Sequence, residues 1–281
     1  MPRIVEVQRL DLPELLPYVD LTGRPRPTLG QAEEIIIAES VPAIYAALRA
    51  GCRPISILAE KRHIEGKAAQ LIRDAGEITV YTAPDALLET LTGYRLTRGV
   101  LCALHRPEPV GLIDLLRKGR RLALLEGVMD ATNIGAIFRS AAALGMDGIL
   151  LSRDSNDPLS RRSIRVSMGG VFRIPFAAVE MRDALALLKE EGFLTAAAVL
   201  SDAAMPLEWF NVCENEKVCV LLGTEASGLA ADTVEACDAR VTIPMAAGMD
   251  SLNVSAAAAI LFWKLGTSSQ SRQVPYPRDL P

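Results

Sequence analysis

The sequence is poor in histidine. Only His63 and His105 occur among its 281 residues, and both lie in the first half of the chain. The chain therefore offers few candidates for a histidine base, for a Ser/His/Asp triad or for a histidine-bound metal. The glycine fingerprints G-x-G-x-x-G and G-x-x-x-x-G-K-[ST] are also missing, so dinucleotide-binding and P-loop enzymes lack their usual sequence support.

An excess of positive charge is missing too. The formal net charge is −4 and the isoelectric point is near 5.4. The molecule as a whole therefore has no field that attracts nucleic acid, and any such binding must depend on local basic patches.

Long apolar runs and paired cysteines are absent. The N-terminus has no apolar core of signal-peptide length. The longest apolar run, residues 254–265, is interrupted by Ser255 and Lys264 and is too short to span a bilayer. The five cysteines form no C-x-x-C pair, which indicates reduced thiols in the core instead of disulfides or a zinc site. We therefore expect a cytoplasmic protein with no membrane partner and no metal.

The composition is that of a folded protein, because 50% of the residues are hydrophobic and 23% are charged. The length suits two domains. Residues from about 33 to 104 alternate β-like and helical runs, which predicts a small α/β domain at residues 1–105. We expect strands at 34–38, 54–59, 78–81 and 99–104, and helices at about 40–51, 61–75 and from 84. Two prolines and a glycine in residues 106–111 open a linker that extends to 118 and includes a short helix.

A second α/β domain is expected at residues 119–266. Its strand candidates are 122–125, 148–151, 176–179, 194–199, 218–222 and 240–243. Continuous apolar runs such as 218–222 suit a parallel sheet that is buried on both faces. The helix at 253–265 is apolar on every side, which predicts complete burial. The tail, 267–281, is expected to be loose.

Three segments of this second domain combine a strand end with unusual polar residues. In the first, residues 130–139, Thr132 or Asn133 caps a helix and Arg139 lies off its apolar stripe. The second, residues 222–229, has two glycines that let the backbone approach a ligand closely, and it carries Glu225. The third, residues 243–253, ends in Ser251 and Asn253. Taken singly, the arginine reads as a solvated side chain, the glutamate as a structural hydrogen-bond acceptor, and the last two as helix caps.

In this order, the three segments resemble the motifs of the SpoU/TrmH family of RNA 2′-O-ribose methyltransferases, within the SPOUT superfamily. The matches are N-x-G-A-x-x-R at 133–139, G-x-E-x-x-G-L at 223–229, and I-P-M followed by S-L-N-V-S at 243–255. The resemblance covers about residues 119–266. The first domain is similar to the ribosomal-protein-like RNA-binding domain that often precedes this catalytic unit. Two positions depart from the usual patterns: Ala247 precedes Gly248 in the third motif, and Ser40 follows Glu39 where glycine is common.

The resemblance implies an α/β domain whose C-terminal segment is threaded into a deep trefoil knot, and a homodimer. It also implies that S-adenosylmethionine binds in the knot, held mainly by backbone groups. The cofactor-binding residues are then Gly223, Ile243 and Leu252, with Thr224 and Met245 beside them. No metal is needed, because the positive charge of the sulfonium already activates the methyl group.

The family also implies catalytic roles for five residues. The arginine matching Arg139 acts in the catalytic step. Its pKa, above 12, makes it a poor base, so we expect it to grip the adjoining phosphate and to stabilise the developing alkoxide. Asn133 is expected to orient the ribose or the arginine. Glu225, Ser251 and Asn253 are expected to hold that cluster in place.

One segment supplies local positive charge for RNA. Residues 158–173 contain four arginines and no acidic residue, and a further arginine lies just upstream. We therefore predict phosphate contacts from Arg153, Arg161, Arg162 and Arg165, with Arg173 nearby; the alternative is a solvated basic helix. Arg95 and Arg98 form a weaker candidate patch in the first domain.

Ribosomal RNA is the favoured substrate, because of the extra N-terminal domain. The alternatives are the same reaction on transfer RNA and a non-catalytic RNA-binding or assembly protein with the same fold. A nucleotide-dependent enzyme of the Rossmann type is disfavoured by the missing glycine fingerprint.

Overall fold

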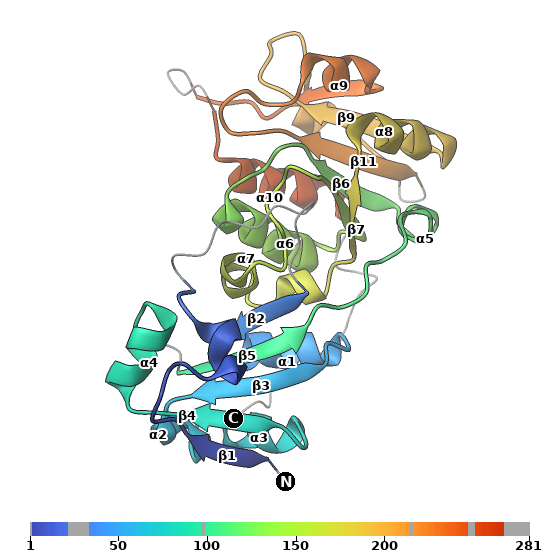
Figure 1. The fold of residues 1–281 in the computed structure, drawn as a ribbon. Helices are drawn as coiled ribbons and strands as arrows, with labels where there is room; N and C mark the ends of the chain where they lie inside the picture. Colours follow the sequence, from blue (N-terminus) through green and yellow to red (C-terminus); the bar gives the residue numbers. More distant parts are fainter. Residues whose placement is uncertain (1, 22–33, 97–98, 214–215, 247–250, 267–281) are drawn as a thin grey trace.

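Two separate β-sheets divide the chain into two α/β units, as Figure 1 shows. The computed structural model describes residues 2–21, 34–96, 99–213, 216–246 and 251–266. The first sheet ends at His105 and the second begins at Arg121; the predicted linker between them contains helix α5 (Leu112–Lys118). The predicted tail 267–281, Arg98, Ala247 and Gly248 lie outside the described residues.

The first unit is built on a five-stranded mixed sheet with the order β1-β4-β3-β5-β2. β1, β4 and β3 run parallel, and β5 runs antiparallel to both β3 and β2. The helix expected at 61–75 is in fact two short helices, and the first strand and the 3-10 helix were not expected. The elements are β1 (Arg3–Glu6), η1 (Pro13–Tyr18), β2 (Ile35–Glu39), α1 (Val41–Arg49), β3 (Pro54–Ala59), α2 (Lys61–Ile64), α3 (Ala69–Asp74), β4 (Thr79–Thr82), α4 (Asp85–Thr92) and β5 (Val100–His105).

The second unit is built on a seven-stranded parallel sheet with the order β10-β12-β9-β11-β6-β7-β8. The six expected strands are present within one residue of their predicted ends. The strands are β6 (Arg121–Leu125), β7 (Gly148–Ser152), β8 (Phe176–Val179), β9 (Phe193–Ala198), β10 (Met205–Pro206), β11 (Lys217–Leu222) and β12 (Ala239–Thr242). The helices are α6 (Ala131–Leu144), α7 (Arg161–Val166), η3 (Gly170–Phe172), α8 (Met181–Glu190), η4 (Leu207–Trp209), α9 (Ala231–Ala236) and α10 (Val254–Leu265).

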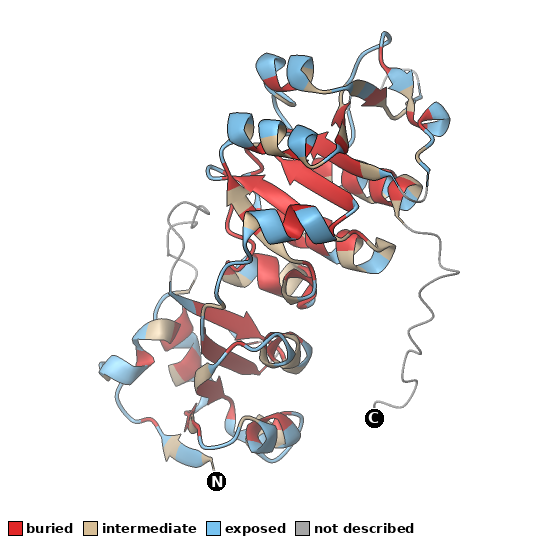
Figure 2. Cartoon of the chain, turned by 90° about the vertical axis from the view of Figure 1, so that its right-hand side faces the viewer, coloured by how far each residue is buried: buried red, intermediate tan, exposed pale blue. Residues whose placement is uncertain are grey.

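This sheet confirms the prediction of parallel strands with two covered faces. Every residue of β6 and β7 is buried, and Figure 2 shows these strands as part of a continuous buried layer between helices. Because the strands are parallel, the loops that follow β6, β11 and β12 all leave the sheet at the same edge.

The last helix is not buried on all sides, so that prediction is wrong. One face of α10, with Val254, Ala258 and Phe262, is buried in the core that it shares with α6. The opposite face leaves Ile260 39% exposed and Trp263 78% exposed. The sequence of an apolar helix does not reveal whether each face packs in the core of the chain or lies on an exposed surface that another molecule could cover.

The cysteines are all free thiols, as predicted, but they are not all in the core. Cys52, Cys102 and Cys219 are buried. Burial raises the pKa of Cys52 to about 11 and that of Cys102 to about 12, so both stay protonated at neutral pH. Cys213 is exposed, so the expectation of a core residue is wrong there.

No helix in the described part of the chain is long and apolar enough to cross a membrane.

The glycine of the first motif is explained by the packing of α7 on α6. A Cβ atom on Gly135 would lie 2.7 Å from Val166 Cβ and 2.8 Å from the carbonyl oxygen of Ser163. Contacts this short require the two helices to separate, because both atoms belong to the rigid part of α7.

We predict that Gly135→Ala destabilises the protein. Overpacking of this kind costs about 1–3 kcal/mol, which outweighs the roughly 1 kcal/mol that alanine gains in a helix. Urea denaturation should show a lower midpoint. The matched control is Gly111→Ala, whose Cβ would meet only Asp114, at 3.8 Å; an unchanged midpoint for Gly135→Ala would contradict the packing argument.

Candidate active site

The loop after β11 is a tight turn that presents Glu225. The backbone N–H groups of Thr224 and Gly228 each donate to the other residue's carbonyl, at 3.0 Å. The Thr224 hydroxyl oxygen accepts from the backbone N–H of Ser227 at 3.0 Å. Glycine is required at position 223, because a Cβ there would lie 2.1 Å from the carbonyl carbon of Gly228. The second motif therefore specifies a closed loop with its carboxylate at the tip.

Glu225 joins the other two motifs through one oxygen. Its Oε1 accepts hydrogen bonds from Asn133 Nδ2 at 2.5 Å and from Asn253 Nδ2 at 2.6 Å. Asn253 Nδ2 also lies 3.1 Å from Asn133 Oδ1. Asn133 lies in the first turn of α6 and Asn253 is the N-cap of α10. The carboxylate thus lies near two helix N-termini, whose dipoles favour a negative charge.

Asn253 has two tasks in this arrangement. Its Oδ1 accepts from the backbone N–H of Ser255 at 2.9 Å, which caps α10. Its amide nitrogen donates to Glu225. The capping role expected from the residue alone and the clustering expected from the family resemblance therefore coexist in one side chain.

A cavity of about 400 Å³ opens beside this cluster, at the ends of β9, β11 and β12. All five residues expected to bind a cofactor line it, namely Gly223, Thr224, Ile243, Met245 and Leu252. Glu225 and Ser251 line it as well. The remaining wall is largely apolar, with residues such as Leu222, Ala257 and Leu261.

The cavity fits S-adenosylmethionine in size and in chemistry. Its volume is within the range of small-molecule sites, which are mostly apolar with a few polar groups. The apolar wall suits an adenine ring. Gly223 and Thr224 line the cavity directly after β11, where the backbone of a strand end can meet a ligand.

Arg139 is not part of the hydrogen-bonded cluster. It is exposed on α6, six residues after Asn133, and it does not line the cavity. In the described part of the chain no hydrogen bond or ion pair holds it. Its projection away from the core matches the sequence prediction, and its guanidinium is free to meet a ligand from solvent.

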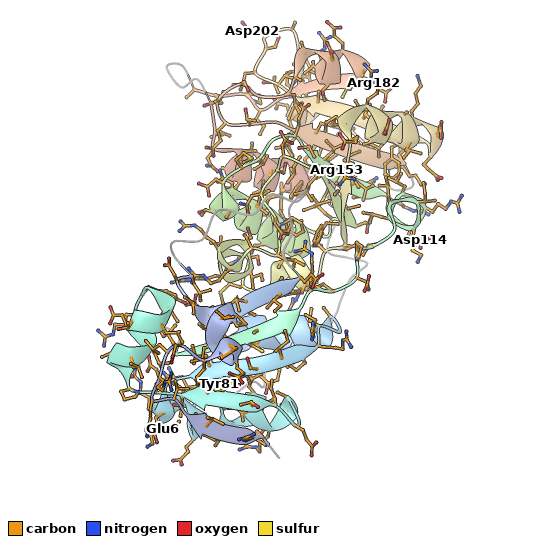
Figure 3. All side chains as sticks on the ribbon, viewed as in Figure 1. Glu6, Tyr81, Asp114, Arg153, Arg182 and Asp202 are labelled. Atoms are coloured by element: carbon orange, nitrogen blue, oxygen red, sulfur yellow. The ribbon has the colours of Figure 1, made fainter. Side chains whose placement is uncertain are left out.

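The four arginines expected to contact RNA are not equivalent. Arg161 is only 20% exposed and donates to Glu39 of the first unit at 3.0 Å, with Arg165 3.6 Å from the same oxygen. Arg153, which is labelled in Figure 3, forms an ion pair with Glu180 at 2.8 Å. Arg162 is exposed and donates to Thr132 Oγ1 at 2.8 Å, so it lies beside the first turn of α6.

Two structural contacts near the site were not anticipated. Glu126, directly after β6, accepts from the backbone N–H of Ala230 at 2.9 Å and from Thr233 Oγ1 at 2.8 Å. It therefore fixes the end of β6 to the start of α9, which follows the Glu225 loop. The second is the pairing of Arg161 with Glu39 across 122 positions of sequence. Glu126 follows a buried strand at the edge that holds the site, and that position is a signal that sequence reasoning could have used.

We predict that Glu225→Ala is far more harmful than Glu225→Gln. Alanine leaves the buried amide of Asn133 without its acceptor, at a cost of about 1–3 kcal/mol, whereas glutamine retains an oxygen that can accept from it. Thermal unfolding and calorimetric binding of S-adenosylmethionine should separate the two variants. Equal melting temperatures for wild type and Glu225→Ala would show that the cluster has no structural role.

Comparisons with known proteins agree with this geometry. The model of the SpoU rRNA Methylase family matches residues 121–263. An uncharacterized tRNA/rRNA methyltransferase of Mycobacterium tuberculosis is 36% identical over 260 residues, which cover 90% of this chain and 88% of that protein. The 23S rRNA (guanosine-2′-O-)-methyltransferase RlmB of Acinetobacter baylyi is 33% identical over 195 residues, covering 66% of this chain and 77% of the relative.

Solved structures share the fold. The AdoMet-bound rRNA methyltransferase from Sinorhizobium meliloti superposes with a TM-score of 0.76 at 24% identity, and the match covers 93% of this chain and 97% of that one. The expectation of an S-adenosylmethionine-dependent RNA 2′-O-ribose methyltransferase is confirmed by the family match and by the relatives together. The chain belongs to the SpoU rRNA methylase family.

Proposed function

We propose that this enzyme methylates a ribose 2′-hydroxyl of ribosomal RNA, in the cytoplasm, with the first unit as its RNA-binding domain. The observation that carries the proposal is the convergence of Asn133, Glu225 and Asn253 beside a cavity of suitable size. Relatives named as 23S rRNA methyltransferases favour ribosomal RNA. Relatives named tRNA/rRNA methyltransferases make transfer RNA the second candidate.

In this proposal each residue of the site has a defined task. Bound S-adenosylmethionine supplies an activated methyl group. Gly223, Ile243 and Leu252 hold it through backbone groups, with Thr224 and Met245 beside them. Asn133 orients the ribose, while Glu225, Ser251 and Asn253 keep the cluster in place. Positioning of this kind contributes several kcal/mol to catalysis, up to roughly 7–11 kcal/mol in the most favourable cases.

Arg139 acts from the solvent side in this proposal. Its exposed guanidinium binds the phosphate next to the target ribose and stabilises the negative charge that develops on the 2′-oxygen. Arg162 of α7 lies beside the first turn of α6, where it donates to Thr132 Oγ1. It provides a second phosphate contact. Arg153 extends the basic surface.

We also propose that the C-terminal segment forms a deep trefoil knot. The chain leaves β12, two strands away from β11, and returns as α10 to pack on α6. At the end of α10, the carbonyl of Leu265 accepts a hydrogen bond from Arg121 Nε of β6 at 2.9 Å. A Cβ on Gly266 would lie 2.0 Å from the carbonyl oxygen of Leu144, so the C-terminal end of α10 is fitted closely against the end of α6.

A homodimer is the state that best suits the exposed face of α10. Ala256, Ile260 and Trp263 form an exposed stripe at i, i+4 and i+7. Trp209, 69% exposed in η4, is part of the same surface region, because Lys264 of α10 donates to the carbonyl of Glu208 at 3.0 Å. Exposed apolar surfaces of this kind mark protein contacts.

We predict that Trp263→Glu converts the dimer to a monomer, since a charge in an apolar contact is costly. Sedimentation velocity measures the change directly. Leu16→Glu, at an exposed apolar position of η1, serves as the control and should leave the sedimentation coefficient as in wild type. A dimer that persists in Trp263→Glu would place the contact elsewhere.

The choice of RNA is tested by methyl incorporation from labelled S-adenosylmethionine into total RNA from a strain that lacks this gene. Label in ribosomal RNA supports the proposal. Label confined to transfer RNA would retain the reaction and overturn the substrate. The absence of label in both would contradict the proposed function.

We predict that Arg139→Ala lowers the turnover number by at least 10²-fold, because the loss of one donor to a developing oxyanion costs about 10²–10³ in rate. Fold and S-adenosylmethionine affinity should stay nearly unchanged, because Arg139 touches neither the cluster nor the cavity. Single-turnover kinetics and calorimetry check both parts. The control is Arg182→Ala, an exposed arginine of α8; wild-type turnover in Arg139→Ala would refute its catalytic role.

A further inference from the structure

The contact between the two units combines apolar packing, in one core cluster that includes Ala43 and Val171, with a buried carboxylate. Glu39, at the end of β2, is 1% exposed. Its Oε2 accepts hydrogen bonds from Arg161 at 3.0 Å and from the Tyr94 hydroxyl at 3.2 Å, and it lies 3.6 Å from Arg165 Nη1. Both arginines belong to α7 of the second unit. A buried carboxylate is stable only when cations or donors pair with it, and the cations here come from the second unit. The ion pairs of Glu39 therefore favour the arrangement in which the two units stay together.

Tyr94 of the first unit contacts both Glu39 and Arg161. The guanidinium of Arg161 lies over its ring, with 4.6 Å between the guanidinium carbon and the ring centroid. Burial, and then the charge of Glu39, raises the pKa of Tyr94, so its hydroxyl stays protonated and remains a donor to Glu39. Arg161 is thus held by an ion pair and by an aromatic face at once.

A second buried ion pair joins the same two units. Arg106, directly after β5, makes two hydrogen bonds to Asp157, at 2.7 and 2.9 Å. Asp157 is buried and also accepts from the backbone N–H of Leu159 at 3.0 Å. The backbone N–H of Arg106 donates to the carbonyl of Glu34 at 2.7 Å, so the arginine itself is anchored to the first unit.

Both ion pairs end on one short segment, residues 157–165, and this segment is bound to α6. Arg162 donates to Thr132, and the Ser163 hydroxyl donates to the carbonyl of Ala131 at 3.0 Å. Thr132 and Ala131 immediately precede Asn133 of the cluster. Figure 1 shows α7 between β2 and α6, as these contacts require.

We propose that Glu39 and Arg106 are positioning residues that lock the first unit to α7, and through α7 to the catalytic helix α6. The first unit then presents RNA to the site in one fixed orientation and so sets which nucleotide reaches it. This step rests on the proposed function only in taking the bound molecule to be RNA. It also assigns Arg161 to the domain contact instead of to a phosphate.

The test compares wild type with the double variant Glu39→Ala/Arg106→Ala. Small-angle X-ray scattering reports the domain arrangement without any reaction. We expect a larger maximum dimension and a broader pair-distance distribution in the variant. With total RNA from a strain that lacks this gene as the substrate of both proteins, the KM for RNA should rise at least 10-fold in the variant. The calorimetric affinity for S-adenosylmethionine should stay within twofold of wild type.

The matched control removes an ion pair of another buried carboxylate, one that does not cross the contact between the units. Glu60 is 2% exposed and accepts from Arg62 Nε at 2.6 Å within the first unit. Glu60→Ala/Arg62→Ala should scatter as wild type does. If Glu39→Ala/Arg106→Ala does not fold by circular dichroism, the single variant Arg106→Ala takes its place; it removes one of the two ion pairs between the units and should broaden the distribution to a smaller extent.

Two outcomes overturn the proposal. One is a scattering profile of the folded variant that superimposes on that of wild type. The other is a control that broadens as much as the variant does. Failure of wild type to methylate any RNA would contradict the proposed function instead, and the scattering comparison would still decide whether these residues lock the units.

Discussion

The structure depends on one constraint: all seven strands of the second sheet run in the same direction, with β11 between β6 and β9. That order brings the loops after β6, β11 and β12 to one edge. There, two amide groups from two helix N-termini share a single carboxylate oxygen of Glu225. Asn133 is buried, so the loss of its acceptor costs more free energy than the hydrogen bond itself contributes. The three motifs are therefore coupled: a change in one loop alters the partners of the other two.

Much of this site could be predicted from the sequence, because the relevant signals are local. The apolar run of β11, the two glycines after it and the spacing to Glu225 together specify a strand followed by a closed loop. The expected cofactor residues Gly223 and Ile243 come from the family resemblance, and both line the cavity after the ends of β11 and β12. The exposed face of α10 was missed for a physical reason. Trp263 is as apolar as a core residue, and periodicity does not reveal which surface covers it.

The arginine-rich segment shows a second limit. Its charge pattern predicted phosphate contacts for Arg161 and Arg165, yet both side chains face Glu39 of the first unit. An ion pair between residues more than a hundred positions apart leaves no local trace, because each partner alone resembles an ordinary charged side chain. The break between α2 and α3 was missed similarly, since the apolar spacing of residues 61–75 fits a continuous helix.

In the mechanism that we propose, the cluster of Asn133, Glu225 and Asn253 fixes the geometry of the site and the exposed Arg139 meets the charge of the substrate. The most direct test of ribose methylation is alkaline hydrolysis of the RNA labelled by this enzyme, followed by separation of the products. A 2′-O-methyl group removes the hydroxyl that alkali needs for cleavage, so we expect the label in alkali-resistant dinucleotides, in wild type and far less in Arg139→Ala. Label in mononucleotides would mean that the methyl group is on a base, and it would contradict the proposed chemistry of this site.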